Sequence, residues 1–176
     1  SFSKYFILVS NRSPNTVRDK VIVAGNQRVL RARLTDAEFF WRQDQAQSLE
    51  SYLPELSNVT FYKGLGTLHD KALRIEALAT AISSYFDTVN PEIAGRAARL
   101  AKADLVTGLV GEFPELQGII GGYYAGASGE VTAVSNAITG HYRPQGPADN
   151  LPATPTAMAV ALADKVDTLV GFFGIN

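Results

Sequence analysis

A run of apolar residues at helical spacing between Thr67 and Phe86 is the feature that most constrains the fold. Steps of four and three residues place these positions on one face of an α-helix: Leu68, Ala72, Ile75, Ala79, Ile82 and Phe86. Thr67 stands where an N-cap belongs, and Asp70 follows three residues later, which is the arrangement of a capping box with Asp in place of Glu. The pattern therefore predicts an amphipathic helix with a defined start.

The rest of the chain also reads as mostly helical. Spacing, prolines and glycines predict a helical pattern from Thr16, a short helix at Leu49–Leu56, and helices from Pro91 to about Val110, at Glu115–Ala125, at Glu130–Tyr142 and at Pro155–Phe173. One strand is expected, from Lys4 to Val9 (KYFILV), because its residues are β-branched and aromatic. No nearby segment could pair with it, so its partner strand is expected either to have been cut away or to come from elsewhere in the fold.

The composition of the chain excludes several classes of function. The 176 residues suggest one domain spanning 1–176, and a net charge of −1 gives the whole chain no field that would attract DNA or RNA. The chain has no cysteine, which excludes disulfides, thiolate zinc sites and cysteine nucleophiles and fits a cytoplasmic location. No apolar run approaches the ~20 residues of a membrane span, so no membrane partner is expected.

Basic residues gather in one segment. Residues 12–33 hold six cations against Asp19, whereas acids dominate residues 34–60. Arg28 and Arg31 share a helix face at i, i+3, and guanidinium groups match phosphate oxygens well. The alternative is an ordinary solvated face on which Arg33 pairs with an acid of the next turn.

Three charged residues fall on apolar or small-residue faces of the predicted helices: Lys71, Asp104 and Asp164. A buried charge is costly unless it is paired, so we expect one ammonium and two carboxylates to meet. The pair His69-Asp70 is not interpreted as a metal site, because Asp70 is explained as the capping acid at a helix N-terminus.

Three runs resemble the helices of HD-domain hydrolases: KALRIEALA from Lys71, ARLAKADL from Ala98 and ALADKVD from Ala161. The resemblance implies an HD-like helical bundle in which Lys71 and Ala103 replace the two histidine ligands. Asp104 and Asp164 would be the remaining carboxylates. Two carboxylates without an imidazole hold a catalytic transition metal poorly. The sequence therefore predicts a degenerate HD site with no metal and no catalytic residue.

Four longer motifs resemble the β subunit of bacterial-type glycyl-tRNA synthetases: NQRVLRARLTDAEFFWRQD, VTFYKGLGTLHDKALRI, AKADLVTGLVGEFPELQG and ALADKVDTLVGFFGI. In that family these motifs lie in the middle of a much longer subunit. The resemblance implies that the chain starts inside a β-hairpin of that subunit, so that residues 1–15 are the remnant of a preceding β element. The resemblance implies a role in attaching glycine to tRNA(Gly) with ATP and Mg²⁺. It also implies an α subunit as partner, and that subunit would activate glycine. The segment itself would bind no cofactor and catalyse nothing.

Within this resemblance the arginines of NQRVLRAR are the candidate tRNA-binding residues: Arg28, Arg31 and Arg33. Internal pairing within the β subunit is the competing use. The sequence also allows two alternative functions: a metal-dependent HD-type phosphohydrolase, and a purely structural helical unit that positions neighbouring domains.

Overall fold

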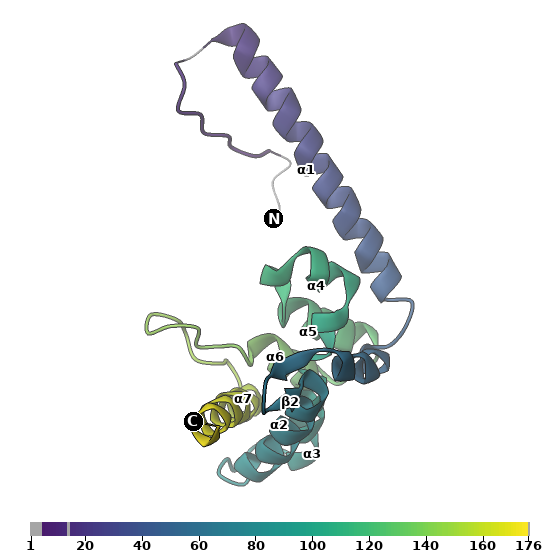
Figure 1. The fold of residues 1–176 in the computed structure, drawn as a ribbon, viewed down its shortest axis with the longest axis vertical. Helices are drawn as coiled ribbons and strands as arrows, with labels where there is room; N and C mark the ends of the chain where they lie inside the picture. The colour runs from purple at the N-terminus through teal and green to yellow at the C-terminus, as the bar shows by residue number, and fades with distance from the viewer. Residues whose placement is uncertain (1–4, 14, 176) are drawn as a thin grey trace. The chain divides into compact units, whose positions relative to one another are not determined.

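The computed structural model describes residues 5–13 and 15–175 (Figure 1). The chain divides into two units, one ending at Phe40 and the other beginning at Trp41. The first unit holds an irregular N-terminal segment and most of a long helix, and the second holds all the other helices and a small hairpin. The prediction of a single domain over residues 1–176 stays a prediction.

The prediction of a mostly helical chain is confirmed. The α-helices of the described chain are α1 (Thr16–Asp44), α2 (Leu68–Ser83), α3 (Pro91–Leu100), α4 (Gly108–Glu112), α5 (Ile119–Ala127), α6 (Thr132–Gly140) and α7 (Pro155–Gly174). Three 3₁₀ segments join them: η1 (Leu49–Asn58), η2 (Ala103–Val106) and η3 (Pro114–Leu116). A two-stranded antiparallel hairpin, β1 (Thr60–Tyr62) and β2 (Gly66–Thr67), precedes α2.

Helix α2 forms where its sequence pattern predicts, and its cap is confirmed. The Thr67 hydroxyl accepts a hydrogen bond from the Asp70 backbone N–H at 3.2 Å, and the Asp70 carboxylate accepts one from the Thr67 backbone N–H at 2.8 Å. These bonds satisfy two N–H groups that the first helical turn leaves without partners. Asp70 is thus a capping residue, as predicted.

Many of the buried side chains between the helices of the second unit are small. Helix α2 packs against α3 and α7, and α6 contacts α3, α5 and α7 (Figure 1). The facing positions are mainly alanine and β-branched residues that are almost fully buried: Ala72, Ile75, Ala79, Ala94, Ala97, Ala98, Ala137, Val160 and Ala163. Such small residues let helix axes approach closely, so a charged side chain between them is surrounded on all sides.

Two predicted elements differ in the structure. The strand expected at Lys4–Val9 is not formed over residues 5–9, its described part, where the backbone is irregular and joins no sheet of the described chain. The single helix expected from Pro91 to Val110 is wrong: α3 ends at Leu100, and the chain continues through η2 into the short helix α4. This break matters because it carries Asp104 off the helix face on which the sequence placed it.

A bilayer span requires a helix that is both long and continuously apolar. None of the helices in the described residues meets both requirements.

Candidate functional site

Lys71 lies in the middle of a buried ion cluster between α2 and α7. It is the fourth residue of α2, and its side chain is 4% exposed. The ammonium Nζ lies 2.9 Å from Asp164 Oδ1 and 2.9 Å from Asp167 Oδ2, and it donates to the Thr168 hydroxyl at 2.8 Å. The ring of Phe61 in β1 covers the same ammonium, with 4.5 Å between Nζ and the ring centroid. The predicted approach of Lys71 to Asp164 is therefore confirmed.

A second lysine, Lys102, forms an ion pair with the other carboxylate oxygen of Asp164. Lys102 Nζ lies 2.9 Å from Asp164 Oδ2, so each carboxylate oxygen faces one ammonium group. The same Nζ lies 2.8 Å from His141 Nε2 and 4.0 Å from the Tyr142 ring centroid. His141 Nδ1 lies 2.6 Å from the Ile138 carbonyl oxygen, so the tautomer protonated on Nδ1 leaves Nε2 to accept from Lys102.

Asp167 extends the cluster toward the surface. Its carboxylate receives hydrogen bonds from Lys71 and from the Arg74 guanidinium, whose Nε lies 2.5 Å from Asp167 Oδ1. Arg74 also donates to the Leu65 carbonyl at 3.0 Å, which fixes the hairpin connection against α2. Two carboxylates and three cations thus hold α2, α7 and the residues after α3 together.

Asp104 does not belong to this cluster, contrary to the prediction that both carboxylates meet Lys71. Because α3 ends at Leu100, Asp104 lies in η2 and points toward the start of α5. Its Oδ2 accepts the backbone N–H groups of Gly118, at 2.6 Å, and Gly121, at 3.0 Å. Gly118 has a φ of +77°, a conformation that glycine adopts freely and that presents its N–H to this carboxylate. A Cβ at Gly121 would lie 2.8 Å from Asp104 Oδ2, so the close approach also requires glycine there.

The four positions matched to HD ligands do not fit a metal ion. Ala103 is fully buried and carries no donor atom, and Lys71 supplies a cation where a ligand would be needed. Both oxygens of Asp164 already face ammonium groups, and Asp104 is held by backbone N–H groups elsewhere. In the described part of the chain, no three His, Asp or Glu side chains gather in a way that could bind a metal. The positive charge beside Asp164 is supplied by the Lys71 and Lys102 side chains.

The titration behaviour of the cluster follows from burial and from its charges. Burial raises the pKa of Asp164, but the Lys102 and Lys71 ammonium groups outweigh burial, and the net pKa lies below its ordinary value. The pKa of Asp167 is likewise lowered, by Arg74 and Lys71 acting against burial. Burial lowers the pKa of Lys102 more than Asp164 raises it. Burial, reinforced by Lys102, lowers the pKa of His141 to about 3, so this imidazole is neutral at pH 7.

The three candidate tRNA-binding arginines lie in the first unit. Arg28, Arg31 and Arg33 are all on α1, and all three are exposed. Their positions along the helix put Arg28 and Arg31 one turn apart on the same side, whereas Arg33 lies on roughly the opposite side. The structure therefore leaves the Arg28 and Arg31 guanidinium groups accessible to a phosphate backbone, while their role stays a prediction.

Sequence reasoning missed Lys102, Arg74, Asp167 and His141. A signal existed for Asp167, because it follows Asp164 by three residues and so shares its helix face, and for Arg74, which follows Lys71 in the same way. Lys102 and His141 carried no such signal. They meet across 39 residues of sequence, and their neighbours on the chain do not indicate which lysine or histidine is buried.

Comparison with known proteins gives one consistent result. The family model described as "Glycyl-tRNA synthetase beta subunit" matches residues 1–176. Curated relatives named "Glycine--tRNA ligase beta subunit" come from Rhodospirillum centenum, 54% identical over 173 residues, and Phenylobacterium zucineum, 53% identical over 177 residues. A third, from Neisseria gonorrhoeae, is 51% identical over 171 residues. These alignments cover 97–98% of this chain but 24–26% of each relative, so the chain spans about a quarter of their length.

Proposed function

Because the chain belongs to the glycyl-tRNA synthetase β-subunit family, we propose that it forms part of a glycine–tRNA ligase, in which it supports tRNA binding and subunit architecture. The whole enzyme would join glycine to tRNA(Gly) with ATP and Mg²⁺ in the cytoplasm, together with an α subunit. This segment would contribute no catalytic group of its own.

The proposal of a non-catalytic role rests on the two ion pairs that Asp164 forms with Lys71 and Lys102. Each of its oxygens lies 2.9 Å from an ammonium group, and both lysine side chains are 4% exposed. A metal-dependent hydrolase needs a cation-binding pocket with an open position for water. Here the pocket is filled by fixed cations, so the geometry favours a scaffold over the phosphohydrolase alternative.

The RNA-binding part of the proposal rests on Arg28 and Arg31. The two side chains are exposed on adjacent turns of α1, and Arg33 adds a third exposed cation in the same stretch. Contacts with phosphates position an RNA without reading its sequence, and they release counterions on binding. A net charge of −1 means that such contacts must come from a local segment, and this is the most basic stretch of the chain.

The test is charge reversal in a full-length β subunit that carries this sequence, assembled with its α subunit. We expect Arg28→Glu combined with Arg31→Glu to weaken tRNA(Gly) binding. The slope of log affinity against log salt should fall by about one for each phosphate that the protein no longer neutralises. Lys63→Glu is the matched control, because Lys63 is an exposed cation in the β1–β2 turn, outside the basic segment. Equal affinity and equal salt slope in the double variant and the control would reject the RNA role.

A further inference from the structure

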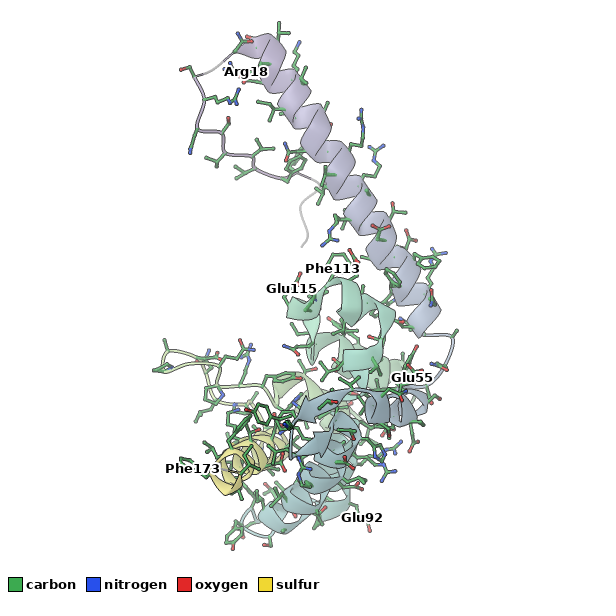
Figure 2. The ribbon with its side chains drawn as sticks, in the orientation of Figure 1. Arg18, Glu55, Glu92, Phe113, Glu115 and Phe173 are labelled. Carbon is green, nitrogen blue, oxygen red and sulfur yellow. The ribbon has the colours of Figure 1, made fainter. Side chains whose placement is uncertain are left out.

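The C-terminal half of α7 presents an apolar stripe to solvent. Val166, Leu169, Val170 and Phe173 follow steps of three, one and three residues, which places them along one side of the helix. Val170 is 66% exposed and Phe173 80% exposed. Figure 2 shows Phe173 at the outer edge of α7. Phe172 faces differently and packs against Tyr62 of the hairpin, with 4.7 Å between ring centroids. Helix α7 therefore has two apolar sides: one packs into the core, and the other is this exposed stripe.

A groove of about 550 Å³ lies beside this stripe. Its apolar walls come from Leu65, from α2 through Ala77 and Leu78, and from α7 through Val166 and Val170. A Cβ at Gly171 would meet Leu65 at 3.0 Å, so this glycine lets the hairpin connection approach the helix backbone where both residues line the groove. A separate, smaller hollow of about 200 Å³ is lined by Thr168, Leu169, Phe172 and Phe173, on the other flank of α7.

The chemistry of the groove suits an apolar occupant. Arg74 and Asp167 are the charged residues that line it in the described chain, and they are bonded to each other through Nε at 2.5 Å. Arg74 also donates to the Leu65 carbonyl, so the groove offers neither an unpaired cation to a phosphate nor an unpaired anion to a metal. A contiguous apolar surface of this kind marks an interaction site in soluble proteins.

We propose that this surface, the α7 stripe with its groove, receives an amphipathic helix from another part of the same β-subunit polypeptide. The curated relatives are about four times as long as the segment that they share with this chain. A covalently linked partner acts at a high effective concentration, in the millimolar range for flexible tethers, and so outcompetes a separate molecule of equal intrinsic affinity. The stripe has the spacing of a helix–helix contact, which is why the occupant is a helix and not a loop.

This inference goes beyond the proposed tRNA role and is independent of it. It requires only family membership and the exposure of α7, so failure of the charge-reversal test at Arg28 and Arg31 would leave it standing.

The test uses a photocrosslinking amino acid in a full-length β subunit that carries this sequence, assembled with its α subunit. Phe173 is replaced by p-benzoylphenylalanine, and the crosslinked peptide is identified by mass spectrometry. We expect crosslinks within one polypeptide, from position 173 to a segment outside these 176 residues. Tyr85 is the matched control, an aromatic residue 86% exposed between α2 and α3, and its replacement should give little crosslinking.

Other crosslinking results would overturn the proposal. A product of two β chains would identify a second copy as occupant, and a product with the α subunit or with tRNA would identify those molecules. Crosslinking at position 173 no greater than at position 85 would show a solvated surface.

Thermal unfolding of the same full-length subunit gives a second measurement. Val170→Asp should lower its Tm by several degrees, since a carboxylate would be forced into an apolar contact, whereas Tyr85→Asp should leave Tm unchanged. Equal Tm values for the two variants would contradict the proposal.

Discussion

Charged residues occur in two contrasting surroundings in this chain. Around Asp164, in the second unit, lysine, arginine and carboxylate groups are packed between α2 and α7 at distances of 2.5–2.9 Å, and most of them are nearly inaccessible. On α1, in the first unit, Arg28 and Arg31 extend into solvent. The charges of the first group are neutralised inside the protein, whereas those of the second are solvated.

The difference shows which charges can be assigned a role from geometry. A buried ion must be paired, because removing one partner leaves the other uncompensated at a cost of several kcal/mol. An exposed ion is solvated whether or not it has a partner, and a surface pair contributes about 0–1 kcal/mol. The geometry therefore indicates that the cluster around Asp164 contributes to stability, whereas we propose that the arginines of α1 act by contacting a bound molecule.

The largest expected effect is that of Lys71→Met. Methionine fills similar volume but leaves Asp164 and Asp167 buried with one cation fewer, so we expect a loss of roughly 3–5 kcal/mol in the free energy of unfolding. Chemical denaturation followed by circular dichroism measures it. Lys63→Met is the control, because Lys63 is exposed. Equal stability of the two variants would mean that the cluster does not hold α2 and α7 together.

A smaller effect is expected at Asp44, the last residue of α1, which is 3% exposed. Its carboxylate accepts the N–H groups of Gly108 and Leu109 at 2.9 and 2.8 Å, and the Tyr124 hydroxyl at 2.9 Å. Asp44→Ala should therefore cost about 2–3 kcal/mol, as the loss of a helix cap and a charged hydrogen bond. Asp36→Ala, at an exposed position of the same helix, should change stability little. Similar losses at both positions would remove the contrast between buried and exposed charges within α1.

The pH dependence of stability should reflect His141. Its pKa is near 6.5 in the unfolded chain and about 3 in the folded one. As pH falls through this window the unfolded state takes up a proton that the folded state does not, so stability falls by about 1.4 kcal/mol per pH unit. The pKa values of Asp164 and Asp167 are lowered by folding, so the stabilisation that these carboxylates contribute is lost only as pH falls below about 3.8. Asp104, whose pKa is raised, works in the opposite direction.

His141→Gln separates these contributions. Glutamine can still accept a hydrogen bond from Lys102 but does not titrate, so urea unfolding between about pH 6.5 and 4.5 should show a shallower fall in stability than in the parent chain. The difference between the two slopes isolates His141, since Asp104 is present in both proteins. Parallel slopes would show that His141 has the same pKa in the folded and the unfolded chain, which would contradict its lowered pKa.

The sequence predicts those parts of the fold that depend on local signals. Thr67, Asp70 and the apolar steps that follow predict α2 and its cap, and the need to pair a buried charge predicts the contact between Lys71 and Asp164. The sequence misplaces Asp104 because no glycine or proline marks the end of α3 at Leu100. The break is stabilised instead by hydrogen bonds from Gly118 and Gly121. Lys102 and Asp164 are 62 residues apart, and no local pattern selects that pairing.

The strand expected at Lys4–Val9 illustrates the same limit. Its β-branched and aromatic composition favours a strand, but a strand also needs a paired strand beside it, and residues 5–9 join no sheet in the described part of the chain. Composition predicts which conformation a segment favours, and tertiary contacts decide whether it forms.

The smallest expected effect on stability is that of Arg28→Glu, which tests whether an exposed cation of α1 differs from the buried cations around Asp164. Arg28 is exposed, and a surface substitution that breaks no buried contact changes stability by about 0.5 kcal/mol or less. The same substitution should weaken tRNA(Gly) binding by the intact α/β enzyme, with the loss shrinking as salt screens the phosphates. Denaturation and binding must be measured on the same variant, because a destabilised helix would also bind RNA poorly. Lower affinity with unchanged stability assigns the charge to a partner, whereas lower stability would place Arg28 with the internally paired charges of the core.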